Sequence, residues 1–416
     1  MEESRNVWDA AIIGGGIVGM SAALELRARG RSVIVLDRDL PRERASYGNA
    51  GVIARTSILP LATPAVWRNI ARYAVNADIA LRLRHAALPG LSNWLTRFLA
   101  NCNIAAVRRA AKALNPLVAA ALDQHVHHAD MVGAQAQIKR NGFLKLYRTE
   151  AAFAASGLER SVLREAGVKV ELVQRGALVD LEPALERQYA WGLFSPDSAS
   201  VERPDRLLEA YRRGFCSRGG SFRACRAGRL RQREHGVDVL TDGGVVAASY
   251  AVIAAGAWSN DLTAPLGYKI SMASERGYHA RLAARAQIQR PIIDTGGAYS
   301  IVPEGDAVRV MTGVELAGSS DAPNYTQLHH AIDQARAAFP LGEMTADPLW
   351  MAPRPSAPDG LPVIGRAPKH PRIVFAFGHG HIGFSTGPIT GRVVADLIDD
   401  AEPPIPLAPF SAARFA

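Results

Sequence analysis

The sequence has few cysteines, no block of like charge and no apolar run long enough to cross a bilayer. Its 416 residues include only Cys102, Cys216 and Cys225, which show no metal-binding spacing and cannot all pair. This excludes a disulfide scaffold and favours a reducing compartment. The longest nearly apolar stretch, residues 10–24, covers 15 positions and contains four glycines, so it is too short for a transmembrane helix.

The basic charge lacks the pattern of a nucleic-acid-binding protein. The net charge is +9, but only six of the 48 basic residues are lysines, and the scattered arginines form no basic cluster interleaved with aromatic residues. Codon bias or attraction to an anionic membrane surface accounts for the charge better. The polar, acidic first six residues lead directly into a strand, which argues against a signal peptide. We expect a cytoplasmic protein and leave peripheral association with the inner membrane face open.

The stretch from Val7 to Asp37 has the order of a dinucleotide-binding unit. An apolar strand, residues 7–13, precedes a turn in which Gly14, Gly16 and Gly19 fit the GxGxxG spacing. A helix over 17–29 and a second strand over 32–36 follow, and Asp37 ends that strand. The glycines let the backbone approach a pyrophosphate at the helix N-terminus, and the acid suits a ribose with a free 2′-hydroxyl. FAD and NAD therefore remain open, whereas NADP is disfavoured.

A second glycine-lined turn lies near the C-terminus. Gly378, Gly380 and Gly383 also satisfy GxGxxG, but no second strand ending in an acid follows, so a second dinucleotide site is not expected. The turn follows an apolar strand over 373–377 and precedes a helix expected from about Pro388. Such a helix N-terminus would face an electron-rich group, such as a reduced flavin.

Between these turns the chain changes character several times. Residues 64–128 predict amphipathic helices separated by Pro89-Gly90 and Pro116, which either pack on the protein or lie on a membrane. A hairpin with a tight turn is expected at 236–248, and an antiparallel sheet is expected between 266 and 350. His125, His127 and His128 lack the spacing of a metal site, and we expect them on the surface.

These residues together resemble the FAD-dependent D-amino-acid dehydrogenase branch of the D-amino-acid oxidase and glycine oxidase superfamily. The resemblance is carried by the N-terminal glycine motif with Asp37, Ser46 to Gly51, Arg276-Gly277-Tyr278, Trp350 to Gly365, and Gly378-His379-Gly380. It implies an α/β fold with a Rossmann-like FAD-binding domain of the glutathione-reductase type and a discontinuous α+β substrate domain. We assign 1–62, 140–265 and 351–416 to the first domain, and 63–139 and 266–350 to the second.

The resemblance also implies noncovalent FAD and oxidation of an amino acid to an imino acid, with electrons passed to a quinone or another acceptor. The expected FAD contacts come from both glycine turns, the segment after Asp37 and the turn after residue 253: Gly14, Gly15, Gly16, Ile17, Val18, Gly19, Asp37, Arg38, Ser46, Asn49, Ala50, Gly51, Ala255, Gly256, Gly378, Gly380, His381, Ile382 and Gly383. The branch usually has Phe-Ala where this chain has Tyr47-Gly48, so the substrate side chain stays open.

Four residues are candidates for the chemistry. Arg354 is expected to bind the substrate carboxylate, because that task needs a fixed cation with two donors. Tyr278 and Tyr299 are candidate second donors or pocket walls, and His379 is a candidate contact to the flavin or the amine. We expect a D-amino acid, small and neutral or cyclic, such as D-proline or hydroxy-D-proline. An oxygen-using glycine or sarcosine oxidase and a non-catalytic flavin-bearing subunit are the alternatives.

Overall fold

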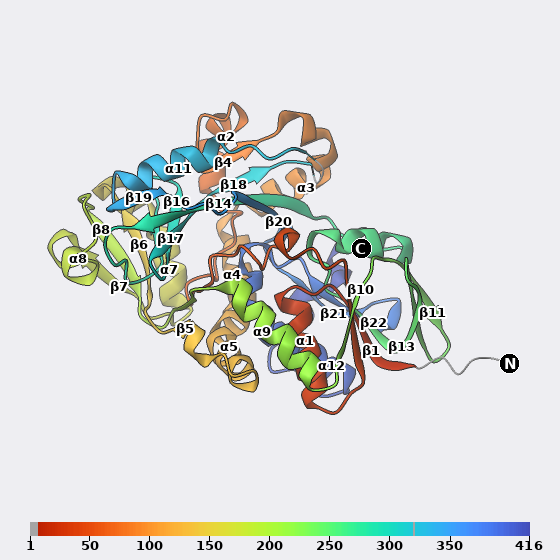
Figure 1. Ribbon diagram of the computed structural model, residues 1–416. Coiled ribbons are helices and arrows are strands. Elements are labelled where there is room, and N and C mark those ends of the chain that lie inside the picture. The colour runs from red at the N-terminus through yellow and green to blue at the C-terminus, as the bar shows by residue number, and fades with distance from the viewer. Residues whose placement is uncertain (1–6, 319–320) are drawn as a thin grey trace.

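The computed structural model describes residues 7–318 and 321–416, which form two lobes built on two separate large sheets (Figure 1). The mixed α/β architecture confirms the predicted fold class. Within the described residues, no helix combines the length and the apolar character that a membrane crossing requires.

An eight-stranded sheet forms the nucleotide lobe and begins with the predicted unit. β1 (Trp8–Ile13), α1 (Ile17–Ala28) and β2 (Val33–Asp37) follow one another, and β1 lies between β2 and β13 (Gly244–Ile253), parallel to both. The sheet is completed by β10 (Ser221–Ala224), β11 (Ala227–Arg233), β12 (Gly236–Thr241), β21 (Val363–Ala367) and β22 (His370–Phe377). β12 and β13 form the predicted hairpin.

Helices cover one face of this sheet and explain its buried apolar strands. α1, α9 (Pro204–Ser217) and α12 (Gly383–Ile398) pack on this face together with α5 (Ala121–Met131). The other face is covered by a second apolar cluster that includes residues of α10 (Ser259–Thr263) and of the C-terminal segment. Burial on both faces is the reason that β1 and β2 read as continuous apolar runs.

The second lobe is built on an eleven-stranded sheet around the long strand β14 (Ala273–Ala284). α11 (Thr326–Arg336) covers one face of this sheet. Its other strands are β4 (Leu81–Leu83), β6 (Phe143–Tyr147), β7 (Glu171–Gln174), β8 (Trp191–Ser195), β15 (Ile292–Asp294), β16 (Tyr299–Glu304), β17 (Ala307–Thr312), β18 (Val314–Leu316), β19 (Leu341–Met344) and β20 (Trp350–Ser356). The predicted antiparallel sheet between 266 and 350 is therefore confirmed. A small third sheet joins β3 (Val52–Ile53), β5 (Ile138–Lys139) and β9 (Ala199–Val201).

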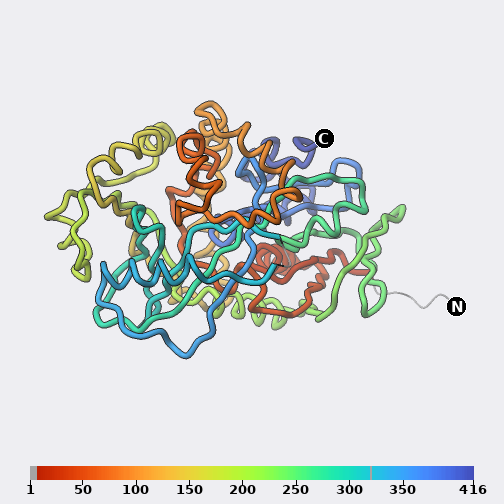
Figure 2. The backbone as a smooth tube through the Cα atoms, turned by 90° about the horizontal axis from the view of Figure 1, so that it is seen from above, coloured from red at the N-terminus to blue at the C-terminus, as the bar shows by residue number. Residues whose placement is uncertain are grey.

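The helical segment connects the two lobes. α2 (Ala65–Ala74) and α3 (Leu88–Asn101) lie at the top of Figure 1, and the same orange segment faces the viewer in Figure 2; between residues 63 and 101 only Trp94 is buried. α4 (Ile104–Ala119) and α5 instead pack against α12 in the nucleotide lobe. The remaining short helices are α6 (Glu150–Ala155), α7 (Gly157–Glu165) and α8 (Arg175–Leu181).

Several expectations about this organisation are wrong. β6, β7 and β8 belong to the large sheet, because β6 pairs with β15 and β8, although we assigned 140–265 to the nucleotide domain. β20, from the segment 351–416, also joins the large sheet by pairing with β14. α12 begins at Gly383 rather than near Pro388, and Pro116 lies inside α4. His125 and His128 are fully buried between helices, not on the surface.

Candidate functional site

A cavity of about 310 Å³ begins where the parallel strands of the nucleotide sheet end and extends to β20 in the large sheet. Ligands of open α/β sheets bind at this edge. The predicted residues that line it are Gly14, Gly16, Ile17, Val18, Asp37, Arg38, Ser46, Asn49, Ala255, Gly256, His379, Gly380, Gly383 and Arg354. The structure therefore brings both glycine turns and the predicted arginine to one space.

The first glycine turn has the shape that a pyrophosphate requires. Gly14 has φ +113°, and a Cβ atom there would overlap the carbonyl oxygen of Ala254. A Cβ atom at Gly19 would overlap the carbonyl oxygen of Gly14, so the helix can approach the strand only with glycine at that position. α1 has no acidic residue in its first turn, and its N-terminal residues Gly16, Ile17 and Val18 line the cavity. The helix dipole thus remains free to attract an anion.

Asp37 organises the ribose end of the cavity. Its Oδ2 accepts a hydrogen bond from the Gly15 amide at 2.6 Å, and its Oδ1 accepts from the Asp39 amide at 2.7 Å and from Arg44 at 2.6 Å. These contacts hold the carboxylate at the end of β2, where a ribose hydroxyl would meet it. Ser46 holds the neighbouring segment, because its Oγ accepts from the Ile17 amide at 3.0 Å.

Some residues at the nucleotide end of the cavity were not predicted from the sequence. Trp258 is one of them: its ring lies 4.3 Å from the guanidinium of the predicted Arg38, and both residues line the cavity. Cys225, Arg226, Ala227 and Gly228 form another wall. No sequence motif marks this wall. It follows β10, and it reaches the cavity because β10 pairs with β2, a contact between distant parts of the chain.

Arg354 lies at the opposite end of the cavity. Its side chain lies over Gly277 of β14, where a Cβ atom would overlap the guanidinium. Among the interactions within residues 7–318 and 321–416, the Arg354 guanidinium takes part in no hydrogen bond or ion pair with another side chain. Burial lowers the pKa of Arg354, and the nearby Glu275 opposes this effect. This half-buried cation lines the cavity with donors that no side chain in the described residues occupies, which suits a bound carboxylate.

The C-terminal glycine turn contributes a neutral histidine. His379 is buried, its Nε2 lies 3.1 Å from the Thr390 hydroxyl, and burial lowers its pKa to about 3. The imidazole is therefore uncharged at neutral pH. His381 and Gly378 do not line the main cavity but a smaller one beside it, which shares His379 and Gly380.

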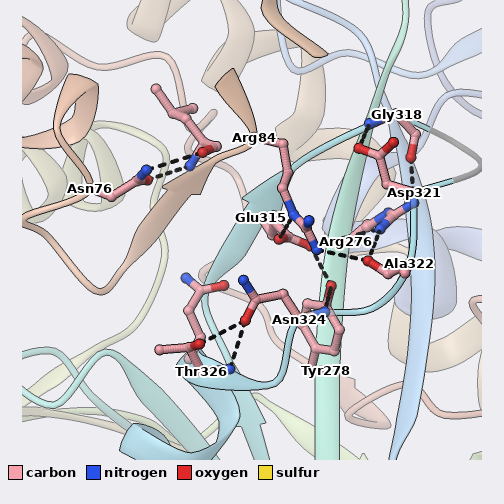
Figure 3. Close-up of polar contacts among 12 residues, drawn as sticks. Asn76, Arg84, Arg276, Tyr278, Glu315, Gly318, Asp321, Ala322, Asn324 and Thr326 are labelled. Carbon is pink, nitrogen blue, oxygen red and sulfur yellow. Dashed lines mark hydrogen bonds and ion pairs between the residues drawn. The ribbon is translucent and has the colours of Figure 1, made fainter. Parts of the chain in front are cut away.

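Tyr278 and Tyr299 do not line the cavity, contrary to our prediction. Alternate residues of a strand face opposite sides, so Tyr278 points away from the face that carries Gly277 and Arg354. The Tyr278 hydroxyl donates to Glu315, which also pairs with Arg84 at 2.8 Å (Figure 3). Tyr278 and Tyr299 both belong to the apolar core between the large sheet and α11.

The Tyr47 to Gly51 loop is fixed by the large sheet. The His279 Nδ1 donates to the Gly48 carbonyl at 3.0 Å, Arg309 donates to the Asn49 carbonyl, and Asn49 Oδ1 accepts from the Gly51 amide at 2.9 Å. Asn49 alone of this loop lines the cavity. The predicted residues that shape turns without lining the main cavity are Gly15, Gly19, Ala50, Gly51, Gly378, His381 and Ile382.

Comparisons with known proteins agree with this geometry. Residues 9–397 match the family described as DAO, FAD dependent oxidoreductase. The chain is similar to a D-amino-acid oxidase of Bradyrhizobium diazoefficiens, with 33% identity over 100% of both chains. It is also similar to a D-amino acid dehydrogenase of Methylobacterium nodulans, with 31% identity over 97% of this chain and 98% of the relative.

Solved structures share the fold across nearly the whole chain. Glycine oxidase from Geobacillus kaustophilus has a TM-score of 0.75 at 24% identity and covers 98% of this chain and 99% of its own. L-proline dehydrogenase from P. horikoshii has a TM-score of 0.77 at 17% identity, with 99% and 98% covered. The predicted resemblance and the FAD cofactor are thus confirmed, and the chain belongs to the DAO family of FAD-dependent oxidoreductases.

Proposed function

We propose that this enzyme oxidises a D-amino acid at its Cα–N bond, giving an imino acid that water converts to a keto acid. The observation that carries the proposal is the half-buried guanidinium of Arg354, which has no side-chain partner among the described residues and lies at one end of a cavity whose other end is shaped for a dinucleotide. The names of the similar curated proteins, D-amino-acid oxidase and D-amino acid dehydrogenase, support the handedness.

Arg354 and His379 position the substrate and form no covalent bond with it. Bound FAD supplies a two-electron acceptor for the Cα hydride. Arg354 binds the carboxylate through two parallel hydrogen bonds and thereby fixes the direction of the Cα–H bond. His379, which lines the same cavity, stays neutral and adds no positive charge that would repel the substrate amine. A small neutral or cyclic side chain, such as that of D-proline or hydroxy-D-proline, is our proposal for the substrate.

The test is anaerobic bleaching of the bound flavin by D-, L- and N-methyl amino acids. We expect a D-amino acid to bleach it fastest and Arg354→Ala to raise KM strongly, with about 2 to 5 kcal/mol of transition-state binding lost. Arg354→Lys keeps the charge but not the two-donor geometry, so we expect only partial recovery. Bleaching by glycine or sarcosine alone, or unchanged turnover in Arg354→Ala, would contradict the proposal.

We propose a quinone or similar carrier as the electron acceptor, reached from a membrane surface. Support comes from α2, whose apolar side leaves Trp67 50% and Ile70 38% exposed, while Arg68 and Arg72 lie on its other side. Such a helix suits the interface of an anionic bilayer. Sedimentation with vesicles containing phosphatidylglycerol tests this: Ile70→Asp should reduce binding, whereas Leu172→Asp, at a similarly exposed site on β7, should not. Faster flavin reoxidation by oxygen than by a quinone dye would instead support the oxidase alternative.

A further inference from the structure

Glu275 and Arg354 face each other in the large sheet without forming an ion pair. The register of β14 and β20 sets Glu275 directly opposite Arg354, so both side chains are on the same face. The guanidinium lies over Gly277, whereas Glu275 faces the small cavity that Ser356 also lines. The strand pair therefore presents a cation and an anion, each with hydrogen-bonding capacity left over.

The carboxylate of Glu275 lacks the partners that a buried acid requires. Glu275 is 3% exposed, and within the described part of the chain its Oε2 makes no hydrogen bond of good geometry; the Ser356 hydroxyl, also without such a bond, is close enough to lower the pKa of Glu275. Burial raises the pKa of Glu275, and the Ser356 hydroxyl and the charge of Arg354 only partly oppose this. Unsatisfied buried acceptors are rare in native proteins, so their presence points to a donor that the site receives.

The space for that donor adjoins the FAD cavity. A cavity of about 20 Å³ is lined by Glu275, Ser356, His379, Gly380 and His381, and by the apolar residues Leu61, Ala62 and Phe98. This volume holds about one water molecule. His379 and Gly380 line both cavities, so a substrate whose carboxylate is on Arg354 lies next to this space.

We propose that Glu275 accepts the proton of the substrate ammonium through one water in this small cavity. This role rests on the proposed function, because an amino acid at neutral pH carries an ammonium group and its Cα hydride leaves readily only when the amine is neutral. One N–H bond of the ammonium breaks and one O–H bond forms on Glu275. The hydride then leaves Cα for FAD, and the product is an iminium that water hydrolyses.

The other groups around Glu275 are less suited to take the proton. The neighbouring charged or titratable groups are Arg354 on β20, and His379 and His381 in the turn after β22; α3 contributes only Phe98 to the cavity. Arg354 is a cation, and burial lowers the pKa of His379 to about 3, whereas burial raises the pKa of Glu275, so the carboxylate is the stronger base. His381 is the remaining candidate, and a variant separates it from Glu275.

The test compares Glu275→Gln with His381→Asn and Arg354→Lys as FAD-loaded proteins. Two quantities are measured: the perturbation of the flavin spectrum by propionate, which has a carboxylate but no amine, and the anaerobic flavin reduction rate by the best D-amino acid from pH 6 to 10. We expect Glu275→Gln to bind propionate within about twofold of wild type, since Arg354 is intact. Its reduction rate should fall about 100-fold or more at pH 7 and recover as pH rises, because more substrate is then deprotonated in solution.

The control variants fix the interpretation. His381→Asn should keep the wild-type pH profile, and Arg354→Lys should weaken propionate binding. Glu275→Asp, which keeps an acid, should be slower than wild type but keep its pH profile, and it serves if Glu275→Gln does not retain FAD. Equal flavin reduction rates for Glu275→Gln and wild type at every pH would overturn the role of Glu275. A fall in the reduction rate that occurs only with substrates that have a polar side chain would overturn it too. If no amino acid reduces the wild-type flavin, the proposed function itself fails.

Discussion

The guanidinium of Arg354 occupies the space that a side chain at position 277 would fill. Because Gly277 and Arg354 lie on neighbouring strands, Gly277→Ala must push the guanidinium away from its position in the cavity. We expect FAD content to stay normal and kcat/KM for the amino acid to fall about 10- to 100-fold, equivalent to about 1.4 to 2.7 kcal/mol. Steady-state kinetics and the flavin absorbance ratio check both parts.

A glycine in open space provides the control for this variant. A Cβ atom at Gly176 in α8 would meet no other atom within 4 Å, so Gly176→Ala should leave kcat/KM unchanged. If Gly277→Ala matched this control, Arg354 would not be the group that binds the carboxylate.

Asp37 is expected to contribute to FAD affinity beyond its role in the fold. The amides of Gly15 and Asp39 and the side chain of Arg44 all donate to its carboxylate, so Asp37→Asn keeps the size of the side chain but removes the charge and replaces one of the two acceptor oxygens with a donor. Loss of a charge-assisted hydrogen bond to ribose costs about 1.5 to 3 kcal/mol, which corresponds to a Kd for FAD at least tenfold higher. Calorimetric titration of the apoprotein measures it, with Asp261→Asn at the same cavity as the comparison. An unchanged Kd would place the ribose elsewhere.

Gly48 lies against two ring side chains of the large sheet, His279 and Trp350. A Cβ atom at Gly48 would lie 2.6 Å from His279 and would overlap the Trp350 ring that stacks on it at 4.7 Å. Gly48→Ala should therefore destabilise the protein by about 1 to 3 kcal/mol, the usual cost of overpacking. Replacing Trp350 with leucine in the same chain should restore part of this loss in urea unfolding. Stability losses that simply add in the double variant would show that the two residues do not collide.

The elements of the fold that depend on residues close together in the sequence could be predicted. The helix expected over 17–29 spans Ile17–Ala28, because its glycine turn and apolar period are local features. Sheet membership was not predictable in the same way. β6 pairs with β15, which lies more than 140 residues further along the chain, and no local pattern records that pairing.

The site shows the same division. Arg354 and both glycine turns were found because short motifs mark them. Tyr278 and Tyr299 were misplaced because the face on which a strand residue lies depends on register, and register becomes visible only when the strands pair. Glu275 was missed because nothing local distinguishes a buried acid beside Arg276-Gly277 from an exposed one.

The start of α12 was misjudged because of a contact that only the tertiary structure supplies. Proline inside a helix cannot donate to the carbonyl four residues earlier, so we expected the helix to begin at Pro388. That carbonyl belongs to Phe384, and the Nε2 of His125 on α5 donates to it at 2.9 Å. The buried histidine thus replaces the hydrogen bond that Pro388 cannot make, next to a residue that lines the FAD cavity.

This contact predicts a dependence of stability on pH. Burial is the main cause that lowers the pKa of His125 to about 3, whereas the unfolded chain binds the proton near pH 6.5. Between these values the unfolded state holds one proton more than the folded state, so acidification reduces the free energy of unfolding. His125 alone should contribute about 1.4 kcal/mol per pH unit to this loss.

Urea unfolding between pH 7 and 5 can isolate the contribution of His125. His125→Gln cannot titrate but keeps a side-chain N–H for the Phe384 carbonyl, so its unfolding free energy should fall less steeply with acidification than that of wild type. The expected difference is about 2 kcal/mol at pH 5. His235→Gln, at an exposed site with 83% of its side chain accessible, should follow the wild-type slope. Equal slopes for His125→Gln and wild type would mean that His125 takes up its proton in the folded protein. A buried neutral imidazole could then not be the group that supports the Pro388 turn of α12.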